Sequence, residues 1–204
     1  MSRAPLAIAI AISLGAGTPG AAEHVLAGAR LFRENRFAEA LVEFRVAERL
    51  GDPDARGYAA AALVKLDRPE QAVELFETPG APPEGRDALL DHFHALACYG
   101  ARLYRCADAL LARVGARAGP RVAEQAARIR ADIAAAFPEE PSSGTVDWYL
   151  ARSDALARDG RSGLAAAFAR EARTLAGMRV DRHGVAEAED RLGRLTSPRA
   201  ADRR

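Results

Sequence analysis

The stretch RENRFAEALVEFRVAERLGDP, residues 33–53, decides the fold class of this 204-residue chain. After a break at Asn35, its apolar residues recur with the spacing of one helical face, namely Phe37, Ala40, Leu41, Phe44, Ala47 and Leu50. Before the break, Val25, Ala29 and Phe32 share one face of another helix. A connection this short predicts two antiparallel helices packed as a hairpin.

The same pattern recurs further along the chain. Ala40 lies 32 residues before Ala72, which in turn lies 35 residues before Ala107. Each of these alanines follows a short break and lies in the second helix of its pair. A fourth and weaker copy covers residues 147–172. Three copies in succession at nearly constant spacing predict a helical repeat array, in which each unit buries its apolar face against its neighbours.

The best-formed copy, AGARLFRENRFAEALVEFRVA at residues 27–47, resembles a tetratricopeptide repeat (TPR), a helix-turn-helix unit of about 34 residues. The matching residues are Gly28, Leu31, Phe37, Ala40, Phe44 and Ala47. Pro69 in the second copy and Arg102 in the third depart from the pattern. The resemblance implies an all-α fold, built as a right-handed stack of antiparallel helical hairpins (a TPR-like α-solenoid) with extra capping helices.

Punctuation by proline, glycine and serine divides the chain into five segments. We expect a signal peptide at 1–22, three TPR-like helix pairs plus a capping helix at 23–137, a linker at 138–146, a degenerate repeat and a C-terminal capping helix at 147–196, and a disordered tail at 197–204. The capping helix before the linker has no partner helix, so it reverses the direction in which the next helix of the stack would run. Residues 147–196 therefore either continue the stack or form a separate half-domain.

The first 22 residues have the layout of a secretory signal peptide. Arg3 precedes an apolar run from Ala4 to Leu14, and Gly20 and Ala22 are the small residues expected before a cut ahead of Glu23. The apolar run is too short to cross a bilayer as a helix. We expect cleavage between Ala22 and Glu23, and a mature protein that is periplasmic or otherwise exported, without stable membrane insertion.

The composition and the cysteines limit the partners. A net charge of +1, from 29 basic and 28 acidic residues, provides no basic excess for binding nucleic acid. In an oxidising compartment, Cys98 and Cys106 suggest a disulfide if a turn separates their helices, and the alternative is two small buried thiols. His92 and His94 point about 200° apart on a helix, so they cannot share a metal. We expect no metal and no cofactor.

The sequence contains none of the common catalytic motifs, so we predict no enzymatic activity. The TPR resemblance implies that the first helix of each pair lines a concave groove, with Phe32, Arg33, Lys65, His92 and Tyr99 as groove residues. Aromatic anchors and cations suit a peptide or a partner protein. We therefore predict an exported interaction or scaffold module. The alternatives are a self-associating structural subunit of an envelope assembly and a hydrolase with an unrecognised site, and the oligomeric state stays open.

Overall fold

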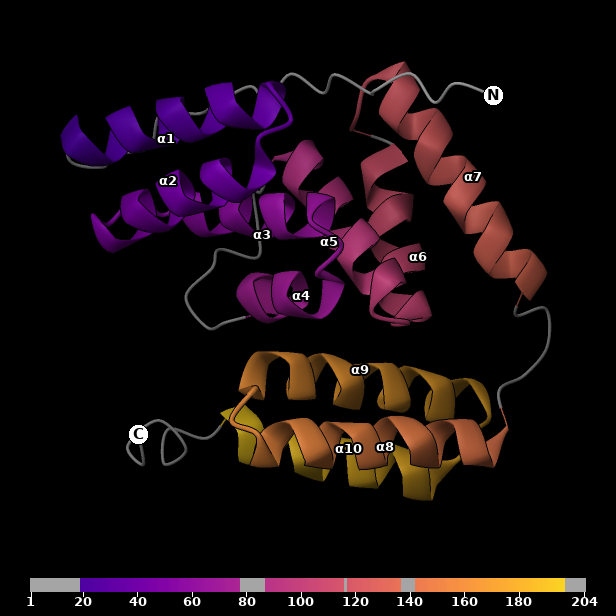
Figure 1. The fold of residues 1–204 in the computed structure, drawn as a ribbon. Helices are drawn as coiled ribbons and strands as arrows, with labels where there is room; N and C mark the ends of the chain where they lie inside the picture. The colour runs from indigo at the N-terminus through magenta and orange to yellow at the C-terminus, as the bar shows by residue number, and fades with distance from the viewer. Residues whose placement is uncertain (1–18, 78–86, 116, 137–141, 197–204) are drawn as a thin grey trace.

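The computed structural model describes residues 19–77, 87–115, 117–136 and 142–196, and these ranges contain ten α-helices and no strand (Figure 1). The helices are α1 (Pro19–Arg33), α2 (Phe37–Arg49), α3 (Ala55–Lys65), α4 (Pro69–Glu77), α5 (Ala88–Gly100), α6 (Tyr104–Gly115), α7 (Pro120–Ala136), α8 (Ser143–Arg158), α9 (Ser162–Met178) and α10 (Arg182–Thr196). The predicted all-α class is confirmed. None of the described helices combines the length and the apolarity that a membrane crossing requires.

Turns of one common geometry join the helices of each hairpin. A residue with left-handed backbone, φ from 57° to 74°, occupies each turn: Asn35, Asp67, Arg102 and Gly160. The next amide donates to the carbonyl five residues earlier, as in the 2.9 Å bond from Arg36 N to Leu31 O, which marks a Schellman motif. Five positions after each left-handed residue lies a fully buried alanine: Ala40, Ala72, Ala107 and Ala165. The regularly spaced alanines of the sequence thus each lie at the same distance from a left-handed turn residue.

Helices α1 to α6 form three antiparallel hairpins that pack side by side. Each hairpin packs its two helices together, and α2 also packs against α3, as α4 does against α5. The first helices α3 and α5 contact each other directly, and α7 packs against α6 at the end of the row. Close approach requires small side chains, because a Cβ added at Gly28 would lie 2.7 Å from the ring of Phe44, which is fully buried on α2.

Helices α8, α9 and α10 form a second group below the hairpins in Figure 1, with α9 packed on both α8 and α10. The same helix α9 also packs against α4 and, less extensively, against α6. The group therefore lies against the second helices of two hairpins, instead of continuing the row beyond α7.

Two glutamates connect the two groups by capping helices of the opposite group. Glu74 of α4 accepts hydrogen bonds from the amides of residues 163 and 164 at the start of α9, at 3.0 and 2.6 Å. Glu171 of α9 accepts from the amides of residues 105 and 106 at the start of α6, at 2.6 and 3.0 Å. Carboxylates at these places satisfy amides that have no partner within their own helix, and they interact favourably with the helix dipole.

Two helices begin earlier than the sequence predicted. Helix α1 starts at Pro19, so the predicted cut between Ala22 and Glu23 falls within its first turns. Proline suits a first turn, because the amide that it lacks would have no helical partner there. Helix α8 starts inside the predicted linker, because Ser142 accepts a hydrogen bond from the Thr145 amide and caps the helix. The predicted signal peptide up to residue 18, the linker residues 138–141 and the tail at 197–204 lie outside the described residues.

Candidate functional site

The first helices of the hairpins bring predicted groove residues around one ring that the sequence reasoning missed. This ring belongs to Phe93, which is fully buried on α5. The Phe32 ring lies edge-on at 5.8 Å between centroids, and Lys65 Nζ lies 5.6 Å from the Phe93 centroid. Phe93 has a signal in the sequence, since Leu90, Phe93 and Ala97 follow helical spacing and are all buried.

The five predicted groove residues differ in their access to solvent. Phe32 is buried and also packs edge-on against Phe37, with 5.1 Å between ring centroids. Arg33 is exposed, Lys65 is half-buried, and burial lowers the pKa of the Lys65 ammonium. Tyr99 is 38% exposed and packs edge-on against Tyr104. Arg33, Tyr99 and the outer part of Lys65 are therefore the members of this set that a ligand can reach.

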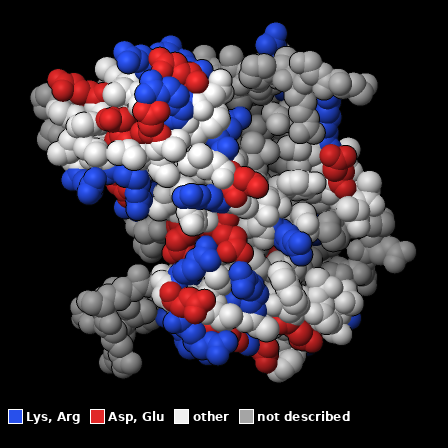
Figure 2. All heavy atoms as spheres, in the orientation of Figure 1, with Lys and Arg blue, Asp and Glu red and all other residues white. Residues whose placement is uncertain are grey.

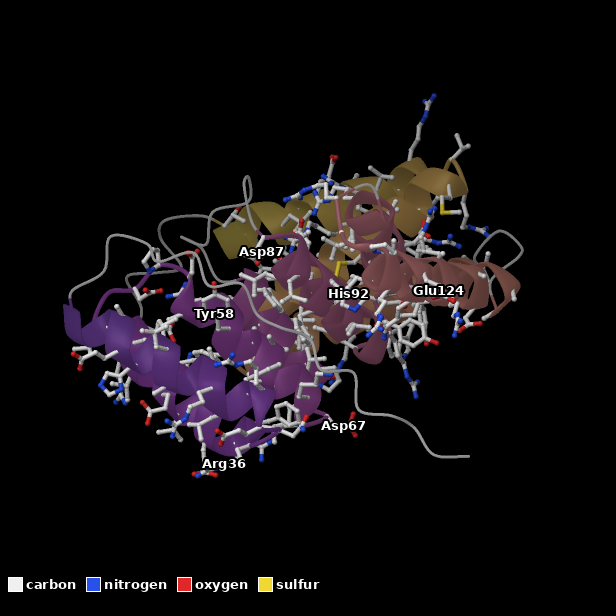
Figure 3. All side chains as sticks on the ribbon, turned by 90° about the horizontal axis from the view of Figure 1, so that it is seen from above. Arg36, Tyr58, Asp67, Asp87, His92 and Glu124 are labelled. Carbon is white, nitrogen blue, oxygen red and sulfur yellow. A yellow bond between two sulfur atoms is a disulfide. The ribbon has the colours of Figure 1, made fainter. Side chains whose placement is uncertain are left out.

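His92 is fully buried, and it lies in the interior of the molecule (Figure 3). Burial lowers the pKa of its imidazole, the Lys65 ammonium lowers it further, and the side chain of Gln125 on α7 raises it. Within the described residues, neither ring nitrogen of His92 makes a hydrogen bond of normal geometry, and the same holds for Gln125 Oε1. His92 therefore lies beneath the surface that carries Lys65, as a neutral ring, and does not reach a ligand directly.

Arg33 and Lys65 occupy equivalent places in consecutive hairpins. Each lies at the end of a first helix, two residues before the left-handed residue of the turn, Asn35 or Asp67. The third equivalent position, two residues before Arg102, is a glycine. The cations thus come from α1 and α3, whereas the exposed aromatic ring of this face comes from α5.

A cavity of about 290 Å³ lies away from the predicted groove residues, where α2, α3 and α4 meet the start of α9. Its lining combines leucines with charged and polar groups: Leu41, Arg45, Leu63, Arg68, Gln71, Glu74, Leu75 and Arg161. A neighbouring depression of about 510 Å³ shares Arg68, Gln71 and Arg161 with it. Sequence reasoning missed this cavity because it exists only once α9 packs against α4.

Charged side chains line the seam between α4 and the α8–α9 pair. Glu70 Oε1 and Oε2 accept hydrogen bonds from Arg152 at 2.9 Å and from Arg161 at 3.0 Å. Burial raises the pKa of the Glu70 carboxyl, but the two guanidinium groups lower it more, so that the net shift is downward. Figure 2 shows acidic and basic side chains side by side along this seam. The seam is consequently a polar contact that holds the two groups of helices together.

Cys98 and Cys106 are joined by a disulfide that links the end of α5 to the start of α6, with 6.1 Å between their Cα atoms (Figure 3). The turn that the sequence reasoning required is present, because α5 ends at Gly100. His94 lies one helical turn before Cys98, and ligand atoms of His94, Cys98 and Cys106 all lie within 4.8 Å of one another. From the sequence we expected no metal here, because the cysteines lack a Cys-x-x-Cys spacing and the nearest imidazoles, His92 and His94, do not complete a ligand set.

A comparison of the chain with protein-family models, with curated proteins and with solved structures finds no significant match in any of the three.

Proposed function

We propose that this chain is a TPR-like interaction module that binds a partner protein or peptide on the face formed by α1, α3 and α5. The observation that carries the proposal is the register of the four turns at Asn35, Asp67, Arg102 and Gly160, in which the left-handed residue precedes a buried alanine by five positions. The same register makes Arg33 and Lys65 equivalent. A row of equivalent positions along neighbouring first helices suits an extended ligand, which meets one helix after another.

The chemistry of this face favours an acidic peptide. Arg33 and Lys65 supply two cations from the first helices of consecutive hairpins, and Tyr99 supplies a partly exposed ring. The Phe32 and Phe93 rings pack edge-on, and Lys65 Nζ lies over the Phe93 ring. Charge-assisted hydrogen bonds to carboxylates are stronger than neutral ones, and a rigid ring offers apolar contact at a small entropic cost. No part of this proposal requires a catalytic group.

Reversal of the two charges tests the groove. Peptides would be selected on the purified chain from a random display library, and the best would be labelled with fluorescein for anisotropy titrations. Arg33→Glu with Lys65→Glu should weaken binding at least about tenfold, because two charge-assisted contacts are lost. The matched control, Arg49→Glu with Arg113→Glu, reverses two exposed arginines on second helices and should leave the affinity within about twofold. Equal affinities of the two double variants would overturn the proposal.

We further propose that the mature chain is exported, on the basis of the signal-peptide layout of residues 1–22. The mass of the protein recovered from its host is expected to correspond to a chain that starts at Glu23. A mass that includes Met1 would contradict export by cleavage.

Self-association is the second candidate, because exposed apolar side chains gather on the first hairpin. Leu26 of α1 and Val42 of α2 are both more than half exposed, and Leu50 lies just after α2. An end hairpin with apolar surface can pair with a second copy. Size-exclusion chromatography with light scattering decides this point, since a mass that stays monomeric at all concentrations would remove the candidate.

A further inference from the structure

We propose that the Cys98–Cys106 pair has a second state, in which the reduced cysteines and His94 bind a zinc ion. The ligand atoms of these three residues lie within 4.8 Å of one another. Around tetrahedral zinc, with bonds of about 2.0 to 2.3 Å, neighbouring ligand atoms lie roughly 3.3 to 3.8 Å apart. The observed separations therefore reach zinc-binding distances through small side-chain rotations, without movement of α5 against α6.

The backbone supports this site from both sides. His94 and Cys98 are four residues apart on α5, so they lie on the same face of that helix. Cys106 projects from α6, whose start is held in place by the hydrogen bond from the Cys106 amide to Glu171. The three ligands thus come from two helices whose relative position the hairpin already fixes, as a built metal site requires.

Neighbouring groups position His94. Its ring stacks on Phe76, with 4.6 Å between centroids, and it is almost completely buried. Glu77 Oε1 lies 3.2 Å from His94 Nε2, and the same carboxylate pairs with Arg170 of α9. A carboxylate beside a ligating imidazole fixes its orientation and increases its basicity. Glu77 would therefore act as a positioning residue for the zinc ligand.

The disulfide and the zinc site exclude each other, because zinc binds thiolates and a disulfide contains none. A dithiol reductant converts one state into the other. Its thiolate attacks Sγ of Cys106, which is the less buried of the two residues, and Cys98 leaves as a thiolate. The second thiol of the reductant then displaces Cys106 and closes the reductant's own disulfide. The two protein thiols lose two protons when zinc binds.

This inference concerns a different face of α5 from the proposed groove, so either proposal can fail without the other. As a consequence, α5 and α6 of the third hairpin stay linked under oxidising and under reducing conditions. In an oxidising compartment the clamp is the disulfide, and in a reducing one it is zinc.

Cobalt substitution tests the site on the full, untagged chain. The protein would be reduced with a phosphine, which is oxidised to its oxide while water supplies the oxygen, and titrated with Co²⁺ without air. We expect one equivalent to bind, with sulfur-to-cobalt charge-transfer absorption and the d–d bands of tetrahedral cobalt, and Zn²⁺ should displace it. The oxidised protein should show neither band. Glu77→Gln should weaken zinc binding by about 10- to 100-fold.

Two variants control the titration. His94→Gln should lose the tetrahedral spectrum, whereas His183→Gln, which removes the exposed His183–Glu187 pair on α10, should keep it. A second readout does not depend on the folding of any variant. In the reduced wild-type protein, Zn²⁺ should slow the alkylation of both thiols, which mass spectrometry measures. Absence of the charge-transfer band together with unchanged alkylation would overturn the proposal, and so would a spectrum that persists in His94→Gln.

Discussion

Val180 adopts a backbone conformation that its side chain disfavours. Its φ is 57° in the turn between α9 and α10, and its side chain is 81% exposed. A β-branched residue in this region costs about 1 to 2 kcal/mol, and little apolar burial offsets the cost at Val180. We predict that Val180→Gly stabilises the protein by about 0.5 to 1 kcal/mol, because relief of strain exceeds the entropy that glycine adds to the unfolded chain. Urea denaturation measures the change.

The matched control for Val180 is Gly160, which has a φ of 74° in the α8–α9 turn and no atom within 4 Å of an added Cβ. Gly160→Ala should therefore destabilise the chain through backbone strain alone, by about 1 kcal/mol. If both substitutions shift the stability in the same direction, strain at these turns is not the cause.

Gly28 tests the closest helix contact of the first hairpin. An added Cβ would lie 2.7 and 2.8 Å from two atoms of the Phe44 ring, which packs in turn against Tyr58. Because this ring is fully buried and cannot swing away, Gly28→Ala should cost about 1 to 3 kcal/mol in spite of the better helix propensity of alanine. Thermal unfolding followed by circular dichroism measures the loss.

Gly177→Ala is the control for Gly28, since it lies near the end of α9 with no atom within 4 Å of an added Cβ. There only the helix propensity changes, and we expect a gain of up to about 1 kcal/mol. Two losses of equal size would show that the Phe44 contact is not what separates the two glycines.

At the scale of the helices, the Glu74 cap makes α9 depend on α4. Helix α9 has Arg161 at its N-cap and receives no side-chain cap from it, so Glu74 supplies the acceptors for its first amides. Glu74→Gln removes the charge and leaves one oxygen to serve two donors. We predict a loss of about 1.5 to 3 kcal/mol, the range for hydrogen bonds to charged groups. Urea denaturation at neutral pH measures it.

Glu124→Gln provides the comparison for Glu74. Glu124 pairs with Arg128 on the exposed side of α7, where a pair four residues apart contributes at most about 0.5 kcal/mol. A loss at Glu74 no larger than the loss at Glu124 would mean that the cap does not hold α9 in place.

The hairpins could be predicted from the sequence because their signals are local. The break at Asn35, the alanines at constant spacing and the helical faces all lie within one repeat length, and the all-α class followed from them. The position of α9 could not be predicted, because the groups that hold it are distant in sequence. Leu164 N donates to a carboxylate 90 residues away, and Arg105 N donates to one 66 residues away. No periodicity within a repeat encodes such a pair.

For the candidate site, the sequence predicted which residues belong to the groove but not which of them are buried. The resemblance to a TPR implied that Arg33 and Lys65 belong to the groove, and both carry solvent-accessible atoms. Register did not reveal which side chains are covered, because burial depends on neighbouring elements, and so His92 lies inside under the influence of Gln125 from α7. The grouping of His94 with Cys98 and Cys106 also needed the third dimension, since it depends on how α6 returns along α5.

At the scale of the whole molecule, the α8–α10 group is attached through a seam whose strength should depend on pH. The pKa of Glu70 is lowered by Arg152 and Arg161, which both belong to that group. A glutamate in the unfolded chain has a pKa of about 4.3. A lower folded pKa means that the folded protein binds fewer protons in this range, so the contribution of Glu70 is complete above about pH 4.3 and is lost as pH falls through the folded pKa.

Glu70→Gln should therefore lower the stability of the seam at neutral pH and flatten its dependence on pH below about 4.3. Trp148, the only tryptophan, lies on α8 beside Tyr149 and Phe168, so its fluorescence reports on the α8–α10 group, whereas far-ultraviolet circular dichroism reports on all helices. In urea titrations at neutral pH, the fluorescence midpoint of the variant should lie at a lower urea concentration than that of the wild type. As pH falls, the midpoint of the variant should shift less than that of the wild type.

Added salt should weaken the wild-type seam more than that of the variant, because these ion pairs are partly exposed. Glu189→Gln on the exposed side of α10 is the control, and it should leave the fluorescence transition unchanged at neutral pH. Identical pH dependence in wild type and Glu70→Gln would show that the carboxylate does not hold the two groups together.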